Sequence, residues 1–343
     1  MKRILLAACL LAAAVTAPAA WADTVRPEHR LTLGVIGDVP YGAAQVAEFR
    51  TDVAEINEDP TIERVIHLGD IKDGGSRCDT TYFQARLADF QAFDEPLVYT
   101  PGDNEWTDCH RASNGAFLPT ERLDTIRQLF FAEPGQTLGR QRRTVRYQSE
   151  AFPENVRWNE ARVTFGTVHV VGSNDDQLPW FGDRKDPVTG QPSPETRAER
   201  AERSREYTKR ESAAVEWIDS IFDAAERRGA RGVAIGMQAD MWDASAPPAA
   251  LTAFEPIKAI LADRAESFGR PVLLLEGDSH KFLVETPEGM PAKLKRVVVQ
   301  GSSSTPREWL RLHVDPKSEQ VFSCENVAYR TGAVSACPAP LAP

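Results

Sequence analysis

The sequence predicts an α/β fold in which a largely parallel or mixed sheet is covered by helices. Short apolar runs alternate with longer amphipathic segments, which is typical of βαβ units. Several of the apolar runs end in glycine followed by aspartate, and no internal repeat of solenoid type occurs. The chain of 343 residues can bury a large core as one domain or two.

The expected elements follow one another along the chain. The amphipathic segments predict helices at 43–57, 82–93 and 204–228, the last with Trp217, Ile218, Ile221 and Phe222 on one face. Two late runs, 297–300 and 309–314, are expected to close a second sheet. The other apolar runs predict strands at 31–36, 64–68, 97–100, 162–171, 232–237 and 271–275.

Two stretches, 132–160 and 179–195, are expected to be irregular insertions over a site. The first holds many arginines and polar residues, and the second is rich in Pro, Gly and Asp. The main domain is expected at 23–323. A segment closed by a disulfide is expected at 324–343, ending in a disordered Pro-Ala-Pro-Leu-Ala-Pro tail.

The first 22 residues look like a secretory signal. Lys2 and Arg3 precede an apolar run at 4–15, and Ala20-Trp21-Ala22 forms a cleavage pattern before Asp23. That run is too short to span a bilayer, and no later run is long enough. We therefore expect an exported protein, periplasmic or extracellular, with no integral membrane segment after cleavage.

Four cysteines remain after the signal: Cys78, Cys109, Cys324 and Cys337. An even number in an oxidising compartment predicts two disulfides. Three pairings are possible, and chain proximity favours Cys78–Cys109 and Cys324–Cys337. A zinc cage is the alternative, but the spacing matches no compact zinc pattern.

The charge of the chain argues against nucleic-acid binding. The formal net charge is −10, and loss of the two basic residues of the signal makes it −12. Proteins that bind nucleic acid need a basic face.

The chemistry of the chain is concentrated where apolar runs end in Gly-Asp. One such pair is a turn or a helix N-cap, but the carboxyl ends of strands in an α/β sheet line a common crevice. Four carboxylates brought together there raise one another's pKa, and a divalent cation relieves the repulsion. The pattern therefore predicts a metal site at Asp38, Asp70, Asp103 and Asp278, joined by Asn104, Glu105, Gln238, Asp240 and His280.

The order of these blocks resembles the calcineurin-like metallophosphoesterases over about residues 31–314. The blocks are Gly-Asp, then Gly-Asp-x-x-Asp at 69–73, Gly-Asp-Asn-Glu at 102–105 and Gly-Asp-Ser-His at 277–280. The resemblance implies a four-layer α/β/β/α sandwich with mixed sheets flanked by helices. It also implies two metal ions that activate a water to attack phosphorus.

By resemblance, Asp38 keeps the first metal ligand, and Asp70 stands for the carboxylate that bridges the two metals. Asp103 stands at the family's asparagine ligand. Asn104 replaces the histidine that helps to protonate the leaving group, and Pro40 stands at another histidine position.

Two further family histidines are replaced by Gln238 and Asp278, and His280 keeps the last one. The implied metal set is rich in oxygen and favours Mn, Mg or Ca over Zn or Fe. One ion is expected to bind well and a second weakly. The set is Asp38, Asp70, Asp103, Gln238, Asp278 and His280.

The inherited catalytic acid is missing, and His110 could supply the proton instead or be a surface loop residue. Lys72 could contact a phosphate or be a solvated loop lysine. His67 and His169 are expected in the core, although Gly172-Ser173-Asn174-Asp175 after His169 could line the site. The arginines at 140, 142, 143 and 146 could steer an anionic substrate or form a solvated face.

The leading hypothesis is a metal-dependent phosphoester hydrolase that acts through a metal-activated water on a small phosphorylated substrate. The alternative is a catalytically weak or inactive relative that binds its ligand without turnover. A third hypothesis is a disulfide-stapled domain whose aspartates only form turns. The substrate and the oligomeric state are not predicted.

Overall fold

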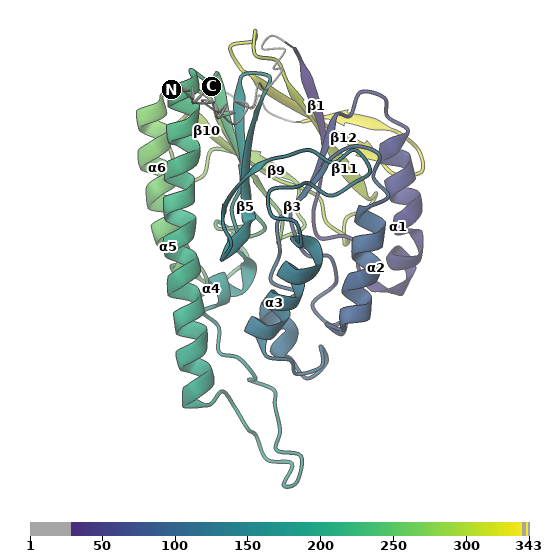
Figure 1. The fold of residues 1–343 in the computed structure, drawn as a ribbon, viewed down its shortest axis with the longest axis vertical. Helices are drawn as coiled ribbons and strands as arrows, with labels where there is room; N and C mark the ends of the chain where they lie inside the picture. The colour runs from purple at the N-terminus through teal and green to yellow at the C-terminus, as the bar shows by residue number, and fades with distance from the viewer. Residues whose placement is uncertain (1–28, 338–340, 342–343) are drawn as a thin grey trace, which may run out of the picture.

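The computed structural model of the chain describes residues 29–337 and residue 341. Two β-sheets stack face to face, and helices cover their outer faces (Figure 1). The predicted secretory signal at 1–22 lies outside the described residues, as does all of the predicted tail except Leu341, which is buried.

The first sheet has six strands in the order β13-β12-β11-β1-β2-β3. β1, β2 and β3 run parallel, and β11, β12 and β13 extend the sheet antiparallel from β1. The strands are β1 (Leu31–Ile36), β2 (Arg64–His67), β3 (Leu97–Tyr99), β11 (Glu308–Val314), β12 (Phe322–Ala328) and β13 (Val334–Ala336).

The second sheet has seven strands in the order β4-β5-β6-β7-β8-β10-β9. β6, β7, β8 and β10 run parallel, and antiparallel strands complete both edges. The strands are β4 (Arg146–Ser149), β5 (Phe152–Glu160), β6 (Val163–Thr167), β7 (Gly232–Gly236), β8 (Val272–Glu276), β9 (Leu283–Glu285) and β10 (Leu294–Val298).

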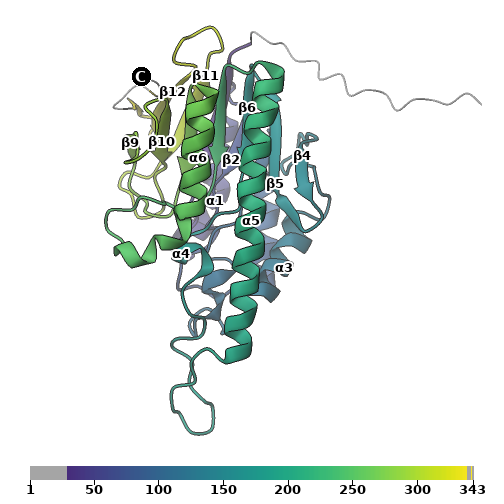
Figure 2. The ribbon, with the colours of Figure 1, turned by 90° about the vertical axis from the view of Figure 1, so that its left-hand side faces the viewer.

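The α-helices are α1 (Gly42–Asn57), α2 (Thr80–Phe90), α3 (Pro119–Phe130), α5 (Arg197–Arg228) and α6 (Glu255–Phe268). The short segment α4 (Gly172–Asp176) is a turn with left-handed φ angles. α5 and α6 lie side by side on the second sheet (Figure 2). α5 begins seven residues before the predicted start, because Thr196 and Glu199 form a capping box there. No helix among the described residues is both long and apolar enough to cross a membrane.

Three apolar layers hold the four structural layers together. The layer between the sheets contains alternate residues of the strands, among them Leu33 and Val35 of β1 and Leu273 of β8. Side chains alternate between the two faces of a strand, so the intervening residues reach the helices. Burial of both faces explains why these strands are almost entirely apolar.

The two outer layers pack helices on the sheets. α1 and α2 cover the first sheet through residues such as Phe49 and Phe90. The predicted apolar face of α5, which includes Trp217 and Phe222, is buried on the second sheet together with α6. The predicted α/β fold with two mixed sheets flanked by helices is thereby confirmed.

The prediction of an irregular insertion over 132–160 is wrong for its second half. Residues 146–149 and 152–160 form β4 and β5, which pair with each other and join β6. The alternation of β5 is hidden because its buried positions include Glu154 and Asn155. Glu154 accepts from Arg127 and contacts His169, so its polar atoms find partners inside the protein.

Two other boundaries and the assignment of one pair of strands differ from the prediction. The run 162–171 ends as a strand at Thr167, and the runs 297–300 and 309–314 contribute to different sheets. The expected domain boundary at residue 323 falls inside β12. The C-terminal segment is therefore an edge of the first sheet, because β12 pairs with β11 along seven residues.

Both disulfides favoured by chain proximity are present, Cys78–Cys109 and Cys324–Cys337. The second joins β12 to the residue that follows β13. Two disulfides are typical of a protein that folds in an oxidising compartment.

Acid should weaken the fold through His67, which is fully buried as predicted. Its Nδ1 accepts the N–H of Gly69, so its Nε2 donates to the carbonyl of Val39. Burial lowers the pKa of His67 from 6.5 to about 3. Below pH 6.5 the imidazole of His67 is therefore protonated in the unfolded chain but stays neutral in the folded chain. The free energy of unfolding falls as the pH falls toward 3.

We expect the free energy of unfolding to fall by about 1.4 kcal/mol for each pH unit between about 6 and 4 from this residue. Urea unfolding at several pH values measures it. His67→Gln should flatten that part of the profile, whereas His29→Gln at a half-exposed position should not. An equal slope in the wild type and His67→Gln would contradict the assignment.

Candidate functional site at the strand ends

The four predicted aspartates gather at the carboxyl ends of neighbouring strands. Asp38, Asp70 and Asp103 follow β1, β2 and β3, and Asp278 follows β8 of the other sheet. The backbone N–H of Asp278 donates to both carboxylate oxygens of Asp38, at 3.0 and 3.1 Å. The predicted convergence therefore occurs where the two sheets meet.

Two of the four Gly-Asp glycines, Gly102 and Gly277, make room for a neighbouring carboxylate. A methyl group on Gly102 would overlap Oδ1 of Asp70, and one on Gly277 would lie 2.5 Å from Oδ2 of Asp38. Each glycine therefore lets the next strand end approach closely.

The aspartates themselves turn the chain. Asp38, Asp70 and Asp278 have positive φ angles of 53°, 58° and 69°, in the left-handed region. Aspartate tolerates this region better than most residues, and such conformations gather at functional sites.

Asp70 is held by three donors. Its Oδ2 accepts from the Tyr41 hydroxyl at 2.7 Å and from the Asn104 side-chain amide at 2.6 Å. Its Oδ1 accepts the backbone N–H of Asn104 at 3.1 Å. Tyr41 was not predicted, although it directly follows the Asp38-Val39-Pro40 block.

Asp103 is held by residues of the second sheet. The side-chain amide of Gln238 donates to its Oδ1 at 3.1 Å, and the hydroxyl of Ser173 contacts its Oδ2 at 2.8 Å. The Oε1 of Gln238 accepts the N–H of Gly172. Gln238 thus contacts the predicted carboxylates, but both ends of its amide have protein partners. Its role as a metal ligand stays a prediction.

Ser173 belongs to the Gly172-Ser173-Asn174-Asp175 segment that the sequence offered as a lining of the site, and it lies in a turn that was not predicted. Residues 173–176 all have positive φ angles, which is rare for side-chain-bearing residues. Buried Arg210 holds this turn through the backbone carbonyl and the carboxylate of Asp175. The turn brings Gly172 against the site: a methyl group there would lie 2.9 Å from oxygens of both Asp103 and Asp278.

His280 lies beside the aspartates on the side of the site that faces solvent. Its Nε2 lies 3.5 Å from Oδ1 of Asp38, and its ring lies edge-on to Tyr41 with centroids 5.1 Å apart. His280, Tyr41, Ser173 and Asp278 are half-buried, so the site can be reached from this side.

Burial and mutual repulsion disfavour the charged carboxylates. Burial, then Asp103 and other acidic neighbours, raises the pKa of Asp70 well above its usual value. Burial, Asp103 and Asp38 do the same to the pKa of Asp278. Burial also raises the pKa of Asp38, although His280 opposes the shift. A cation would relieve this repulsion.

A buried layer of polar groups supports the site from below. Oε1 of Glu105 accepts the N–H groups of Asp70 and Gly102 and the hydroxyl of Tyr99. Lys72 is fully buried, and its Nζ donates to the carbonyls of Asp73 and Asn104. The expectation of a solvated loop lysine is therefore wrong, because backbone carbonyls and nearby carboxylates compensate its buried charge.

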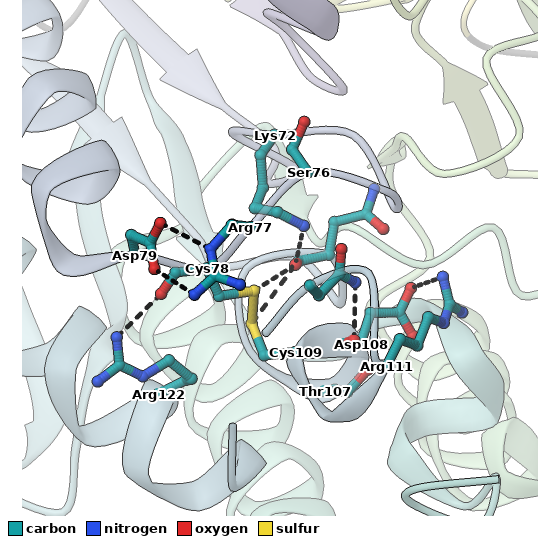
Figure 3. The surroundings of a disulfide bond; sticks show 12 residues. Lys72, Ser76, Arg77, Cys78, Asp79, Thr107, Asp108, Cys109, Arg111 and Arg122 are labelled. Atoms are coloured by element: carbon teal, nitrogen blue, oxygen red, sulfur yellow. Dashed lines mark hydrogen bonds and ion pairs between the residues drawn. A yellow bond between two sulfur atoms is a disulfide. The ribbon is translucent and has the colours of Figure 1, made fainter. Parts of the chain in front are cut away.

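The Cys78–Cys109 disulfide fastens the loop that carries Asp103 and Asn104. Figure 3 shows the bridge together with Lys72, Asp108 and Arg111. The bridge joins the segment before α2 to η1 (Thr107–His110). Beside it, Arg111 contacts Asp108 at 2.7 Å, and burial and Asp103 raise the pKa of Asp108 to about 7.

The structure directs His110 toward the 179–195 loop. Its Nδ1 accepts the N–H of Phe181 at 2.9 Å, and burial lowers the pKa of His110 to about 4. Its catalytic role stays a prediction, and this orientation does not support it.

The remaining predicted residues lie away from the carboxylates. His169 is fully buried, as expected, but follows β6 and contacts Glu154 at 2.9 Å. The arginines at 140, 142, 143 and 146 are exposed. Arg140 and Arg142 pair with Asp94 and Glu133, which fits a solvated face.

The side chains gathered here are mainly oxygen ligands, which suit Mg, Mn or Ca better than Zn or Fe. Among residues 29–337 and 341, no group of three or more His, Cys, Asp or Glu side chains is arranged to hold a metal ion. Protein donors also take the carboxylate oxygens of Asp70, Asp103 and Asp38. Carboxylate oxygens are nevertheless the type of ligand that Mg, Mn and Ca take.

Comparisons with known proteins show a shared fold. No family model and no curated protein sequence matches the chain. GAP50, the anchor in the inner membrane complex of Plasmodium, aligns with a TM-score of 0.50 and 8% identity, over 90% of this chain and 88% of its own. An assigned 5'-nucleotidase from Staphylococcus aureus, solved with alpha-ketoglutarate, aligns with a TM-score of 0.42 and 13% identity, over 92% of this chain and 55% of its own. This chain thus spans about half of that second protein.

Removal of the Cys78–Cys109 disulfide should destabilise the fold more than removal of Cys324–Cys337. The bridges close loops with sequence separations of 31 and 13 residues. Loop entropy predicts losses of about 3.7 and about 2.9 kcal/mol, respectively. Double Cys→Ala variants compared by urea unfolding measure both losses, and a larger loss for Cys324–Cys337 would contradict the ranking.

Gly102→Ala should lower the free energy of unfolding by about 1–3 kcal/mol, because its methyl group would overlap Asp70. Gly182→Ala is the matched control, since no atom lies within 4 Å of the added methyl group. Thermal unfolding of both variants measures the difference. Equal melting temperatures would show that the Gly-Asp turns are not closely interlocked.

Proposed function

We propose that the chain is a phosphoester hydrolase that depends on a divalent cation. The observation that carries the proposal is the gathering of four aspartates, three buried and one half-buried, at the ends of strands from both sheets. Repulsion between such groups favours a bound cation or protons. The sequence blocks that supply them resemble those of metallophosphoesterases.

The residues that would hold the ion are Asp38, Asp103 and Asp278, with His280 beside them. A bound Mn, Mg or Ca ion would polarise a phosphoryl group and lower the pKa of a water. The half-buried rim formed by Tyr41, Ser173 and His280 is where a substrate would meet the site. The imidazole of His280 can donate a hydrogen bond to a phosphoryl oxygen, whereas the hydroxyls of Tyr41 and Ser173 already donate to Asp70 and Asp103.

A second candidate function is a cation-dependent phosphate-binding protein without turnover. Asn104, which stands where the family has a proton donor, uses its side-chain amide on Asp70 and on the Tyr41 oxygen. An amide does not act as a general acid near neutral pH, so a leaving group would lack a proton source here. This observation favours a small phosphorylated ligand that binds and leaves unchanged.

Elemental analysis of the mature protein, joined to phosphoester assays, tests both functions. We expect the wild type to hold about one divalent ion per chain after incubation with Mn, Mg, Ca or Zn, and to hydrolyse p-nitrophenyl phosphate or its diester. Asp278→Asn should lose the ion and the activity. The exposed Asp124→Asn change is the control and should keep both.

The outcomes separate the candidates. Ion binding and phosphate binding without turnover would support the binding protein. A wild type that takes up no ion and hydrolyses neither ester would contradict the hydrolase.

A further inference from the structure

Three successive serines in the loop between β10 and β11 contact Asp38 and His280. The N–H and the hydroxyl of Ser302 both donate to the backbone carbonyl of Asp38, at 3.0 and 2.6 Å. The hydroxyl of Ser304 donates to the backbone carbonyl of His280 at 3.1 Å. These two hydroxyls hold the backbone in place, whereas the hydroxyl of Ser303 contacts the imidazole of His280.

Ser303, His280 and Asp38 form a continuous row of side chains. The Oγ of Ser303, an exposed residue, lies 2.9 Å from Nδ1 of His280. The other ring nitrogen, Nε2, lies 3.5 Å from Oδ1 of Asp38, which is fully buried. The row therefore runs from a buried carboxylate through an imidazole to a hydroxyl at the surface. This is the order of groups in a triad of nucleophile, base and carboxylate.

Close packing holds the imidazole and the carboxylate in this order. A methyl group on Gly301 would lie 2.6 Å from Cγ of His280 and 2.9 Å from Cβ of Asp38, so glycine is required beside them. His280 has a φ angle of 60°, and its ring lies edge-on to Tyr41. Left-handed residues other than glycine cost stability and gather at functional sites. The backbone N–H of Asp278 holds both oxygens of Asp38.

The contacts also fix where the proton of a neutral His280 must be. The hydroxyl of Ser303 can donate to Nδ1 only when the ring proton is on Nε2. The Nε2–H group then faces the carboxylate of Asp38, which favours this tautomer. The distance of 3.5 Å is compatible with this role, because catalytic hydrogen bonds are often long until a substrate binds.

We propose that Ser303 is the nucleophile of a second activity, the hydrolysis of uncharged carboxylic esters without a metal ion. His280 is the general base, and Asp38 is a positioning residue. The inference goes beyond the proposed cation-dependent function and does not rest on it. An uncharged ester suits the surroundings, because without a cation the nearby carboxylates of Asp103 and Asp278 would repel an anionic substrate.

The reaction has two balanced stages. The Oγ of Ser303 forms a bond to the carbonyl carbon of the ester while its proton passes to Nδ1 of His280. The bond from that carbon to the leaving oxygen breaks, and His280 gives the proton to the departing alcohol. A water then attacks the serine ester and passes a proton to Nδ1. The carboxylic acid leaves as that proton returns to Oγ of Ser303.

Labelling with a fluorophosphonate in the presence of EDTA tests the inference. The Oγ of Ser303 displaces fluoride from phosphorus, and mass spectrometry should find about one adduct per chain, on the peptide that contains Ser303. Ser303→Ala should take no label, and His280→Gln should react at least about 100-fold more slowly. Ser335→Ala, at an exposed position of β13, is the matched control and should react as the wild type does.

Turnover is followed as release of p-nitrophenol from p-nitrophenyl butyrate, also in EDTA. The wild type should show a burst of about one equivalent per chain and then steady release, and Ser303→Ala should show neither. The wild type unfolded in urea should take no label, which separates an activated serine from a merely exposed one. Circular dichroism establishes that each variant is folded. EDTA keeps cations away from Asp38 and His280, which are also candidates to hold the ion of the proposed function.

Several outcomes would overturn the inference. They are a folded wild type without label, a label on another residue, a folded His280→Gln variant that reacts at the wild-type rate, and a labelled protein that does not hydrolyse the butyrate ester. None of them bears on the cation-dependent phosphoester hydrolase, which is measured with an added cation and a different substrate. Loss of phosphoester hydrolysis in Asp278→Asn likewise leaves the labelling of Ser303 as a separate measurement.

Discussion

Four aspartate carboxylates share one end of the molecule, within reach of one another's charge and removed from water. Burial and repulsion raise the pKa of Asp38, Asp70 and Asp278, so the ionised forms of these carboxylates are destabilised. Such a group persists only where hydrogen bonds, protons or a cation compensate it. Much of the surrounding structure supplies that compensation.

The compensation is unevenly distributed. Asp70 receives neutral donors from Tyr41 and Asn104, and Glu105 fixes the backbone beneath it. Asp278 has little beyond a distant N–H group. The two sides of one cluster therefore differ in their hydrogen bonds: Asp70 is enclosed by protein donors, and Asp278 is not.

The supporting structure favours precise placement over flexibility. Arg210 holds a left-handed turn against the site, the Cys78–Cys109 bridge fastens the loop after β3, and Lys72 fills the space between backbone carbonyls. Preorganised groups of this kind stabilise a fixed distribution of charge without reorganising. They serve a hydrolase and a binding protein equally well, so the fold alone does not choose between the two functions.

The sequence by itself determined the layered α/β fold, both disulfides and the four Gly-Asp strand ends. These features could be predicted because apolar runs, helix periodicity and short separations between cysteines are properties of residues close together in the sequence. It failed at β5, Lys72 and Tyr41, and it did not predict the left-handed turn that carries Ser173. Glu154 and Lys72 are polar residues whose partners come from distant segments, and a polar residue reads as exposed until those partners are known. Only the tertiary structure decided which donors reach which carboxylate, because side chains far apart in the chain meet at one edge of two sheets.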